Sequence, residues 1–161
     1  SSLNGSLLSF VADANKKLYH FANEQGKVLG MTLVRLVDWD QTPTLLVENL
    51  YATEWNDDYG IAFLGSLAEK AACLYDETGK EVRIALPYHT GHDGHTTNIQ
   101  LSKAFERFSK QYHVEIHEDT LSVSPSQSKN TFEYWDCGPG KIASGTPVSL
   151  DVQYLRFGNE E

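Results

Sequence analysis

One segment of the chain predicts a strand, a helix and a second strand in direct succession. The first strand is the apolar, β-rich run Thr44–Ala52, and the second is Val82–Leu86. Gly79 lies before the second strand as the expected C-terminal cap of the helix. Between the strands, apolar residues recur at helical spacing: Leu64, Leu67, Ala68, Ala71, Leu74 and Tyr75. Strands joined through a helix usually lie parallel with a right-handed crossover, so this unit fixes the centre of the expected sheet.

Before this unit the chain predicts an antiparallel meander of strands. Two β-rich runs, Leu18–Ala22 and Val28–Val37, are joined by a short turn in which Gly26 suits a positive φ angle. Asp38–Pro43 is the next expected turn. Residues 1–17 are expected to be loosely ordered or to form a short helix.

After this unit the chain predicts a second helix and further strands. The helix runs from about Ile99 to Tyr112, and Thr97 and Gln100 have capping-box spacing at its start. Residues 124–130 are a flexible loop by composition. The later strand-like runs are His113–His117, Thr120–Ser124, Thr131–Trp135 and Val148–Phe157. The order β-β-β-α-β-α-β-β describes an α+β domain with a mixed, mostly antiparallel twisted sheet and helices packed on it.

Length and charge narrow the class of protein. The 161 residues are enough for a hydrophobic core and predict a single domain over residues 1–161. Acidic residues outnumber basic ones by 22 to 13, which argues against general binding to nucleic acid or to an anionic membrane. No run approaches the roughly 18 apolar residues of a membrane span, and a cytoplasmic protein is expected. Two cysteines make no disulfide framework, and Cys73 is expected to be a buried thiol in the first helix.

The turn between the first strand and its helix carries a motif. Residues Asp57–Ala62 (DDYGIA) together with the element order resemble the Gcn5-related N-acetyltransferase (GNAT) family, from about Leu18 to Phe157. In that family a pyrophosphate loop, Arg/Gln-x-x-Gly-x-Gly/Ala, opens the main helix, and Gly60 and Ala62 match its last two defined positions. The resemblance implies an acyl-CoA-dependent N-acyltransferase that uses acetyl-CoA. Its acceptor would be an amine-bearing small molecule or protein, and the acidity of the chain suits a cationic acceptor.

The resemblance also implies roles for particular residues. The strand backbone that would hold the pantetheine arm is that of Asn49, Leu50, Tyr51 and Ala52. The N–H groups that would hold the phosphates are those of Tyr59, Gly60, Ile61 and Ala62. Glu48 lies where general bases occur in the family, although a surface or cross-strand-paired carboxylate is the alternative.

The acids in the motif depart from the family pattern. Asp57 stands where the family has a basic or amide residue, and Asp58 follows it. At an effective dielectric of about 20, a carboxylate about 4 Å from a phosphate charge costs roughly 4 kcal/mol, less with water and salt. Alternatively, Asp57 or Asp58 caps the helix and complements its dipole.

Two further departures concern the second helix and the start of the domain. Ala104 to Phe108 keeps the spacing of the family's Ala-x-x-x-Tyr pattern, but phenylalanine has no proton to give to a departing thiolate. Tyr112, one turn further on, is the candidate substitute. Too few residues precede Leu18 for the family's usual first strand and two helices, so either that part is cut away or the chain is a shortened variant. A catalytically degenerate GNAT-like binding or interaction module is therefore the alternative function.

Two local compositions suggest chemistry outside the family pattern. His89, His92 and His95, with Asp93, could bind Zn²⁺ or another transition metal, or supply a general base; a polar mobile loop is the alternative. Cys137 lies among glycines and could act as the nucleophile of a Cys/His thiol hydrolase. A turn cysteine without a catalytic role is the alternative there.

Overall fold

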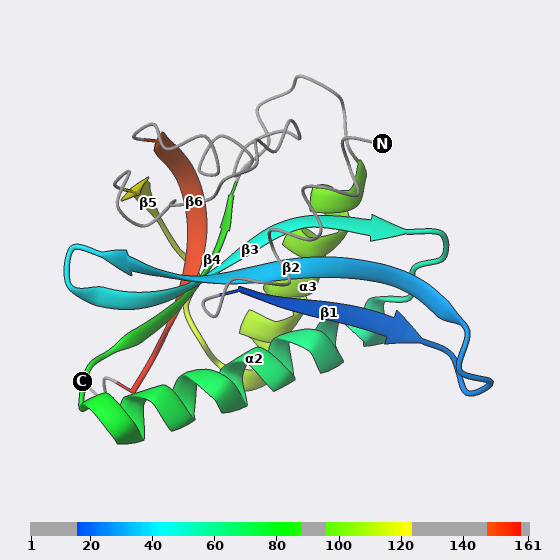
Figure 1. The fold of residues 1–161 in the computed structure, drawn as a ribbon, viewed down its shortest axis with the longest axis horizontal. Helices are drawn as coiled ribbons and strands as arrows, with labels where there is room; N and C mark the ends of the chain where they lie inside the picture. Colours follow the sequence, from blue (N-terminus) through cyan, green and yellow to red (C-terminus); the bar gives the residue numbers. More distant parts are fainter. Residues whose placement is uncertain (1–15, 88–95, 124–147, 159–161) are drawn as a thin grey trace.

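A computed structural model describes residues 16–87, 96–123 and 148–158 of the chain. The described elements are β1 (Lys16–Ala22), β2 (Val28–Trp39), β3 (Thr42–Ala52), α2 (Asp57–Thr78), β4 (Val82–Pro87), α3 (Thr96–Tyr112), β5 (His117–Val123) and β6 (Val148–Phe157). The strands form one 6-stranded sheet in the order β1-β2-β3-β4-β6-β5 (Figure 1). Only β3 and β4 are parallel among these neighbours. The predicted α+β fold, its element order and its parallel central pair are confirmed.

The first hairpin forms as predicted from its turn residues. The side-chain oxygen Oδ1 of Asn23 accepts hydrogen bonds from the N–H groups of Gln25, at 3.0 Å, and Lys27, at 2.9 Å. Gly26 has a φ of 80°, in the left-handed region that glycine adopts without a steric penalty. The side chain of Asn23 therefore organises the turn, and Gly26 allows the chain to reverse.

The second hairpin is tighter than predicted. Strands β2 and β3 extend into the expected turn Asp38–Pro43 and leave only Asp40 and Gln41 between them. Both residues have positive φ angles, 48° and 69°, which is the geometry of a two-residue type I′ turn. Asp is common at the first position of such turns, whereas the second position favours glycine.

Replacing Gln41 with glycine is expected to stabilise the protein by about 0.5–1 kcal/mol. Glycine removes the steric cost of a left-handed residue, and this gain exceeds the extra freedom of the unfolded chain. The measurement is the free energy of unfolding in urea. Gln25→Gly, in the other hairpin, is the control, because Gln25 has no positive φ. A Gln41→Gly protein no more stable than wild type would contradict the assigned turn.

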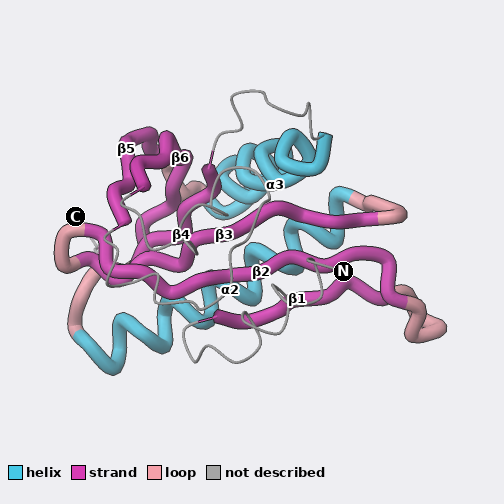
Figure 2. The backbone as a smooth tube through the Cα atoms, turned by 45° about the horizontal axis from the view of Figure 1, so that its top comes forward, coloured by secondary structure: helices cyan, strands magenta, loops and turns pink. Residues whose placement is uncertain are grey.

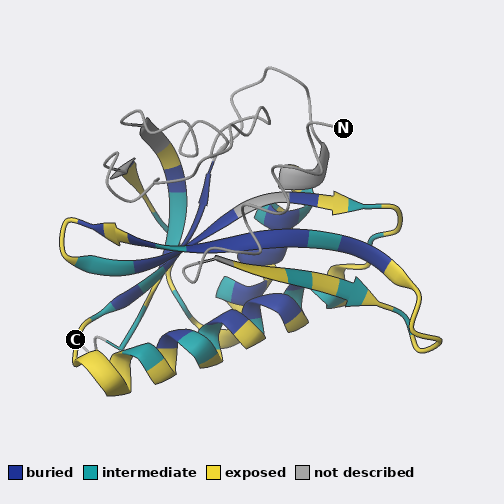
Figure 3. Cartoon of the chain, viewed as in Figure 1, coloured by how far each residue is buried: buried dark blue, intermediate teal, exposed yellow. Residues whose placement is uncertain are grey.

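Both helices pack on one face of the sheet. Leu45 and Ile84 belong to the core cluster that contains the apolar residues of α2 and α3. Their neighbours Leu46 and Ala85 belong to a second cluster on the opposite face, because successive side chains of a strand alternate. Figure 2 shows both helices as cyan coils against the strands, and Figure 3 shows the centre of the sheet as buried. The helical residues in the first cluster are Phe63, Leu64, Leu67, Ala71, Leu101, Ala104, Phe105 and Phe108.

Charged residues connect the second cluster to Glu81, which lies between α2 and β4. The guanidinium carbon of Arg83 lies 4.6 Å from the ring centre of Trp39 and 4.9 Å from that of Tyr154. The Nε–H of Arg83 donates to a carboxylate oxygen of Glu81 at 2.9 Å, and the Nε–H of Arg156 donates to the other oxygen. Burial alone would raise the pKa of Glu81, but the hydrogen bonds from the two arginines outweigh it and hold that pKa below its usual value. The carboxylate of Glu81 is therefore ionised and structural.

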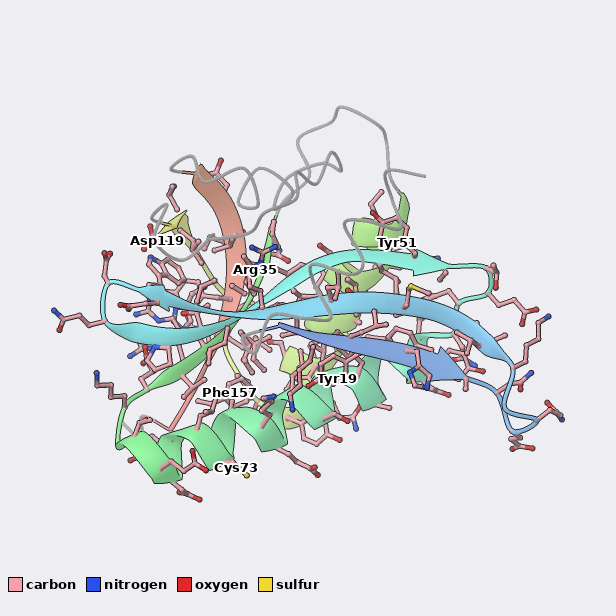
Figure 4. All side chains as sticks on the ribbon, viewed as in Figure 1. Tyr19, Arg35, Tyr51, Cys73, Asp119 and Phe157 are labelled. Carbon is pink, nitrogen blue, oxygen red and sulfur yellow. The ribbon has the colours of Figure 1, made fainter. Side chains whose placement is uncertain are left out.

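Several local predictions are confirmed or corrected at the helix ends. Gly79 caps the end of α2 as predicted, with a φ of 67°, and its N–H donates to the carbonyl of Tyr75 at 2.7 Å. Cys73 was expected to be buried, but its side chain is exposed and points away from the sheet (Figure 4). It lies off the apolar stripe of the helix, and Cys73 therefore plays no part in the core.

The second helix begins earlier than expected. Because α3 starts at Thr96, Thr97 lies inside its first turn and not at the predicted cap position. The prediction of a strand over His113–His117 is wrong for every residue except His117. His113 has a φ of 55° and leaves the helix, and β5 starts only at His117. The predicted loop 124–130 and the strand Thr131–Trp135 lie outside the described residues. Neither described helix is long and apolar enough to cross a membrane.

Candidate functional site: a fork between two parallel strands

Strands β3 and β4 pair over a short stretch and then separate. β3 continues as a strand from Val47 to Ala52, whereas β4 ends at Pro87. Figure 1 shows the ends of the two strands pointing in different directions. The residues that pair are Thr44 with Arg83, Leu45 with Ile84, and Leu46 with Ala85. We call the segment Val47–Ala52 of β3, together with Leu86–Pro87 of β4, the fork.

A β-bulge in β3 explains why the strands separate. The register of β2 with β3 shifts between Thr32 and Val34. Leu33, the residue between them, therefore faces two residues of β3, Glu48 and Asn49. A bulge bends its strand and increases the local twist, and bulges are frequent beside active sites. The predicted site residues Glu48 and Asn49 thus lie at the bend where the fork opens; their side chains lie outside the described part of the structure.

One edge of β3 lines the fork with backbone groups. In an antiparallel pair, alternate residues direct their N–H and C=O groups toward the partner strand, and the others direct theirs away from it. β3 pairs with β2 as far as Ala52, but no described strand pairs with its other edge beyond Leu46. The residues Asn49, Leu50, Tyr51 and Ala52, predicted to hold a pantetheine arm, all lie on this stretch.

Helix α3 packs beneath the fork. Leu101 and Phe105 of α3 share a core cluster with Leu50 of β3 and Leu86 of β4. Ser102, between those two helical residues, donates a hydrogen bond of 3.4 Å to Gln153 of β6. These four apolar side chains are fully buried, so α3 fixes the strands of the fork from within the core.

The first turn of α2 follows the end of β3 and is capped by Asn56. The Oδ1 atom of Asn56 accepts from the N–H of Asp58 at 2.8 Å, and its carbonyl accepts from the N–H of Tyr59 at 2.9 Å. Asn56 has the extended backbone of an N-cap residue, with φ −135° and ψ 133°. The prediction that Asp57 or Asp58 caps the helix is therefore wrong. Both acids lie within the first turn, where they complement the helix dipole as predicted.

The early start of α2 places the predicted phosphate-binding residues inside the helix. Because α2 begins at Asp57, the residues Tyr59, Gly60, Ile61 and Ala62 lie in its first two turns and not in a loop before it. From Gly60 onward, α-helical N–H groups donate to carbonyls one turn earlier in the same helix. These N–H groups are therefore directed along the helix.

Close packing accounts for the glycine of the motif. A Cβ atom at Gly60 would lie 2.6 Å from the Cβ of Ala104 and 2.9 Å from a ring carbon of Trp55. Gly60 is buried and has no positive φ. Glycine is thus required there for the close approach of α2 and α3. The match of Gly60 to the GNAT motif has a structural explanation that involves no ligand.

Among the described residues, both acids of the first turn form ion pairs with Arg107. Nη1 of Arg107 lies 3.4 Å from Oδ2 of Asp57, and its Nη2 lies 3.9 Å from Oδ1 of Asp58. The indole N–H of Trp55 donates to Oδ1 of Asp57 at 3.2 Å. These exposed ion pairs add little to stability, but they leave two carboxylates against one guanidinium. Sequence reasoning missed Arg107, because no local pattern links it to acids so far away in the chain.

The predicted proton donor Tyr112 lies at the far end of α3. It is the last residue of the helix and is 53% exposed, and its ring packs on that of Phe108 at 4.6 Å. A rise of about 1.5 Å per residue places Tyr112 roughly 15 Å along the axis from Ser102, which lies beside the fork. Phe108, at the family's tyrosine position, is buried in the core. No phenol is therefore fixed beside the fork within the described part of α3.

The remaining predicted sites cannot be placed in this fold. His89, His92, His95 and Cys137 lie outside the described residues. Within residues 16–87, 96–123 and 148–158, no group of three or more His, Cys, Asp or Glu residues is arranged to hold a metal ion.

Comparison with known proteins gives one distant structural match. The chain is similar to a crystal structure described as a "putative acetyltransferase" from Sphaerobacter thermophilus, with 12% sequence identity and a TM-score of 0.36. The match covers 96% of this chain and 86% of the other. No model of a known protein family matches the chain, and no curated protein sequence matches it. The match is a distant resemblance of fold and says nothing about activity.

Proposed function

We propose that this chain is a GNAT-like binding module whose fork receives an extended chain that carries amide groups. The observation that carries this proposal is the edge of β3. The segment Val47–Ala52 keeps strand geometry after its pairing with β4 has ended. An extended ligand with N–H and C=O groups can add to such an edge as an extra strand does.

The family's cofactor fits only one half of this site. The β3 edge suits the amides of a pantetheine arm. At the first turn of α2, however, the N–H groups of Asp58 and Tyr59 are already bonded to Asn56. The carboxylates of Asp57 and Asp58 lie on the same turn. We therefore propose a ligand other than acetyl-CoA, namely an extended chain of amides that is uncharged or positively charged.

The position of Glu48 favours a second candidate, an acyl-CoA-dependent N-acyltransferase. The bulge puts the backbone of Glu48 at the bend of the fork, beside the edge of β3 along which a ligand would lie. As a general base, Glu48 would take the proton of that amine. The acceptor would be a small molecule or protein bearing an amine. Tyr112 would have to act as the proton donor from the end of α3, which is why this candidate ranks second.

Titration of two matched ligands separates the candidates. S-acetylpantetheine has the amide arm without phosphates, and acetyl-CoA has both. We expect S-acetylpantetheine to shift the backbone amide NMR signals of Val47–Ala52 in a saturable way, with no thiol released when spermine is added as an acceptor. If S-acetylpantetheine leaves these signals unchanged, the binding module is wrong. Release of CoA thiol from acetyl-CoA that is lost in Glu48→Gln would establish the second candidate instead.

A further inference from the structure

We infer that the first turn of α2 excludes phosphate groups, so that a ligand of the fork carries no phosphate at that end. The exclusion itself depends only on residues of α2 and α3. The conclusion about the fork's ligand rests in addition on the proposed function. Three observations lead to the exclusion.

The first observation concerns hydrogen-bond donors. A helix N-terminus binds phosphate through the N–H groups of its first turn, which have no partner within the helix. In α2, the side chain of Asn56 takes the N–H of Asp58, and its carbonyl takes the N–H of Tyr59. A phosphate would have to displace a cap that the protein itself supplies.

The second observation concerns charge. The helix dipole contributes the equivalent of roughly half a positive charge at its N-terminus. Asp57 and Asp58 add two negative charges there, and Arg107 returns one positive charge. For the described residues these charges sum to a negative value, so a polyanion is repelled. The indole N–H of Trp55 holds the carboxylate of Asp57 in place, which keeps this charge at the turn.

The third observation is the position of the turn relative to the fork. β3 ends at Ala52, and the connection to α2 is anchored immediately afterwards. The N–H and the hydroxyl of Thr53 both donate to the carbonyl of Leu29, at 2.8 and 3.1 Å. Only residues 53–56 separate the end of β3 from the start of α2, so a ligand that continues along β3 past its C-terminal end comes within a few residues' length of this first turn.

Inorganic pyrophosphate is the probe for this exclusion, because it can reach the first turn of α2 without binding in the fork. We expect millimolar pyrophosphate, at constant ionic strength, to cause no saturable NMR shift at the amides of Asp57, Asp58 or Tyr59 in the wild-type protein. The double variant Asp57→Asn/Asp58→Asn keeps the shape of both side chains and removes their charge. Its dissociation constant for pyrophosphate should be at least about 10-fold lower than the limit set by the wild-type titration, because the charge of Arg107 is then no longer opposed by the two carboxylates.

The matched control is Asp76→Asn, which removes an exposed charge from the other end of the same helix. Pyrophosphate binding should not change in this variant, which separates a local effect from net charge. Adding Arg107→Ala to the double variant should abolish the gain. Saturable binding of pyrophosphate to the first turn of the wild-type protein would overturn the inference, and so would a double variant that gains nothing. The S-acetylpantetheine titration tests the fork separately, because it reports on amides of β3.

Discussion

Replacing Gly60 with alanine is expected to lower the free energy of unfolding by about 2 kcal/mol. Alanine normally stabilises a helix interior by about 1 kcal/mol relative to glycine. At Gly60 this gain is outweighed, because the new Cβ would lie 2.6 Å from the Cβ of Ala104 and 2.9 Å from the ring of Trp55. Both contacts are shorter than van der Waals contact, so α2 and α3 must move apart. Urea unfolding measures the loss.

The same helix supplies the matched control. A Cβ atom at Gly65 would meet nothing within 4 Å, so Gly65→Ala should stabilise the protein by about 1 kcal/mol. The two substitutions therefore have opposite signs. Adding Ala104→Gly to Gly60→Ala should recover part of the loss, because the two residues are in contact and their effects are coupled. A Gly60→Ala protein as stable as wild type would show that α2 and α3 are not packed as closely as described.

This result bears on any functional test at the motif glycine. A variant of Gly60 that fails to bind a ligand does not place the ligand at Gly60, since the substitution displaces the helix that leads from the fork. Charge-only changes at Asp57 and Asp58 avoid this difficulty, because both side chains are exposed. They are the better probes of the first turn.

Replacing Glu81 with glutamine is expected to cost about 2 kcal/mol of stability at neutral pH. The substitution keeps the shape of the side chain but removes the charge that accepts from Arg83 and Arg156. Arg83, whose guanidinium lies over the rings of both Trp39 and Tyr154, would then lack its anionic partner. The loss should appear as a lower midpoint of urea unfolding.

The effect of Glu81 has a defined pH dependence. Its pKa in the folded protein is below the usual value of 4.5, so its stabilising contribution is complete above that value and is lost as the pH falls through the folded pKa. The difference between wild type and Glu81→Gln should therefore shrink in acid. Glu69→Gln, on the exposed face of α2, is the control and should stay within about 0.5 kcal/mol of wild type at each pH. A difference for Glu81→Gln that stays constant down to strong acid would show that charge is not the cause.

Local periodicity predicted the centre of the fold from the sequence. The helical spacing of Leu64, Leu67 and Ala71, followed by Gly79, placed α2, and the flanking β-rich runs made the pair β3 and β4 parallel. These features depend on residues close together in the chain. The tight turn at Asp40 and Gln41 was harder to predict, because neither residue is glycine.

The details of the site depend on choices that the sequence leaves open. Asn56, Asp57 and Asp58 are all good N-cap residues, and only the backbone shows that the helix starts after Asn56. The bulge at Glu48 and Asn49 interrupts a run that is strand-like throughout, so periodicity does not reveal it. The partnership of Arg107 with the acids depends on tertiary packing. The motif Asp57–Ala62 was therefore recognisable as a motif, but its conformation was not.

The bulge in β3 also reverses which side of the strand faces inward. Before it, Leu45 and Val47 point to the helices; after it, Leu50 does so, although an unbroken alternation would turn that position away. The extra residue thus shifts the alternation of inward and outward side chains in β3 by one position. A strand without it would carry Leu50 away from the helical core and bring Tyr51, now 40% exposed, toward it. The opening of the fork and the burial of Leu50 therefore both depend on the one extra residue that the bulge adds to β3.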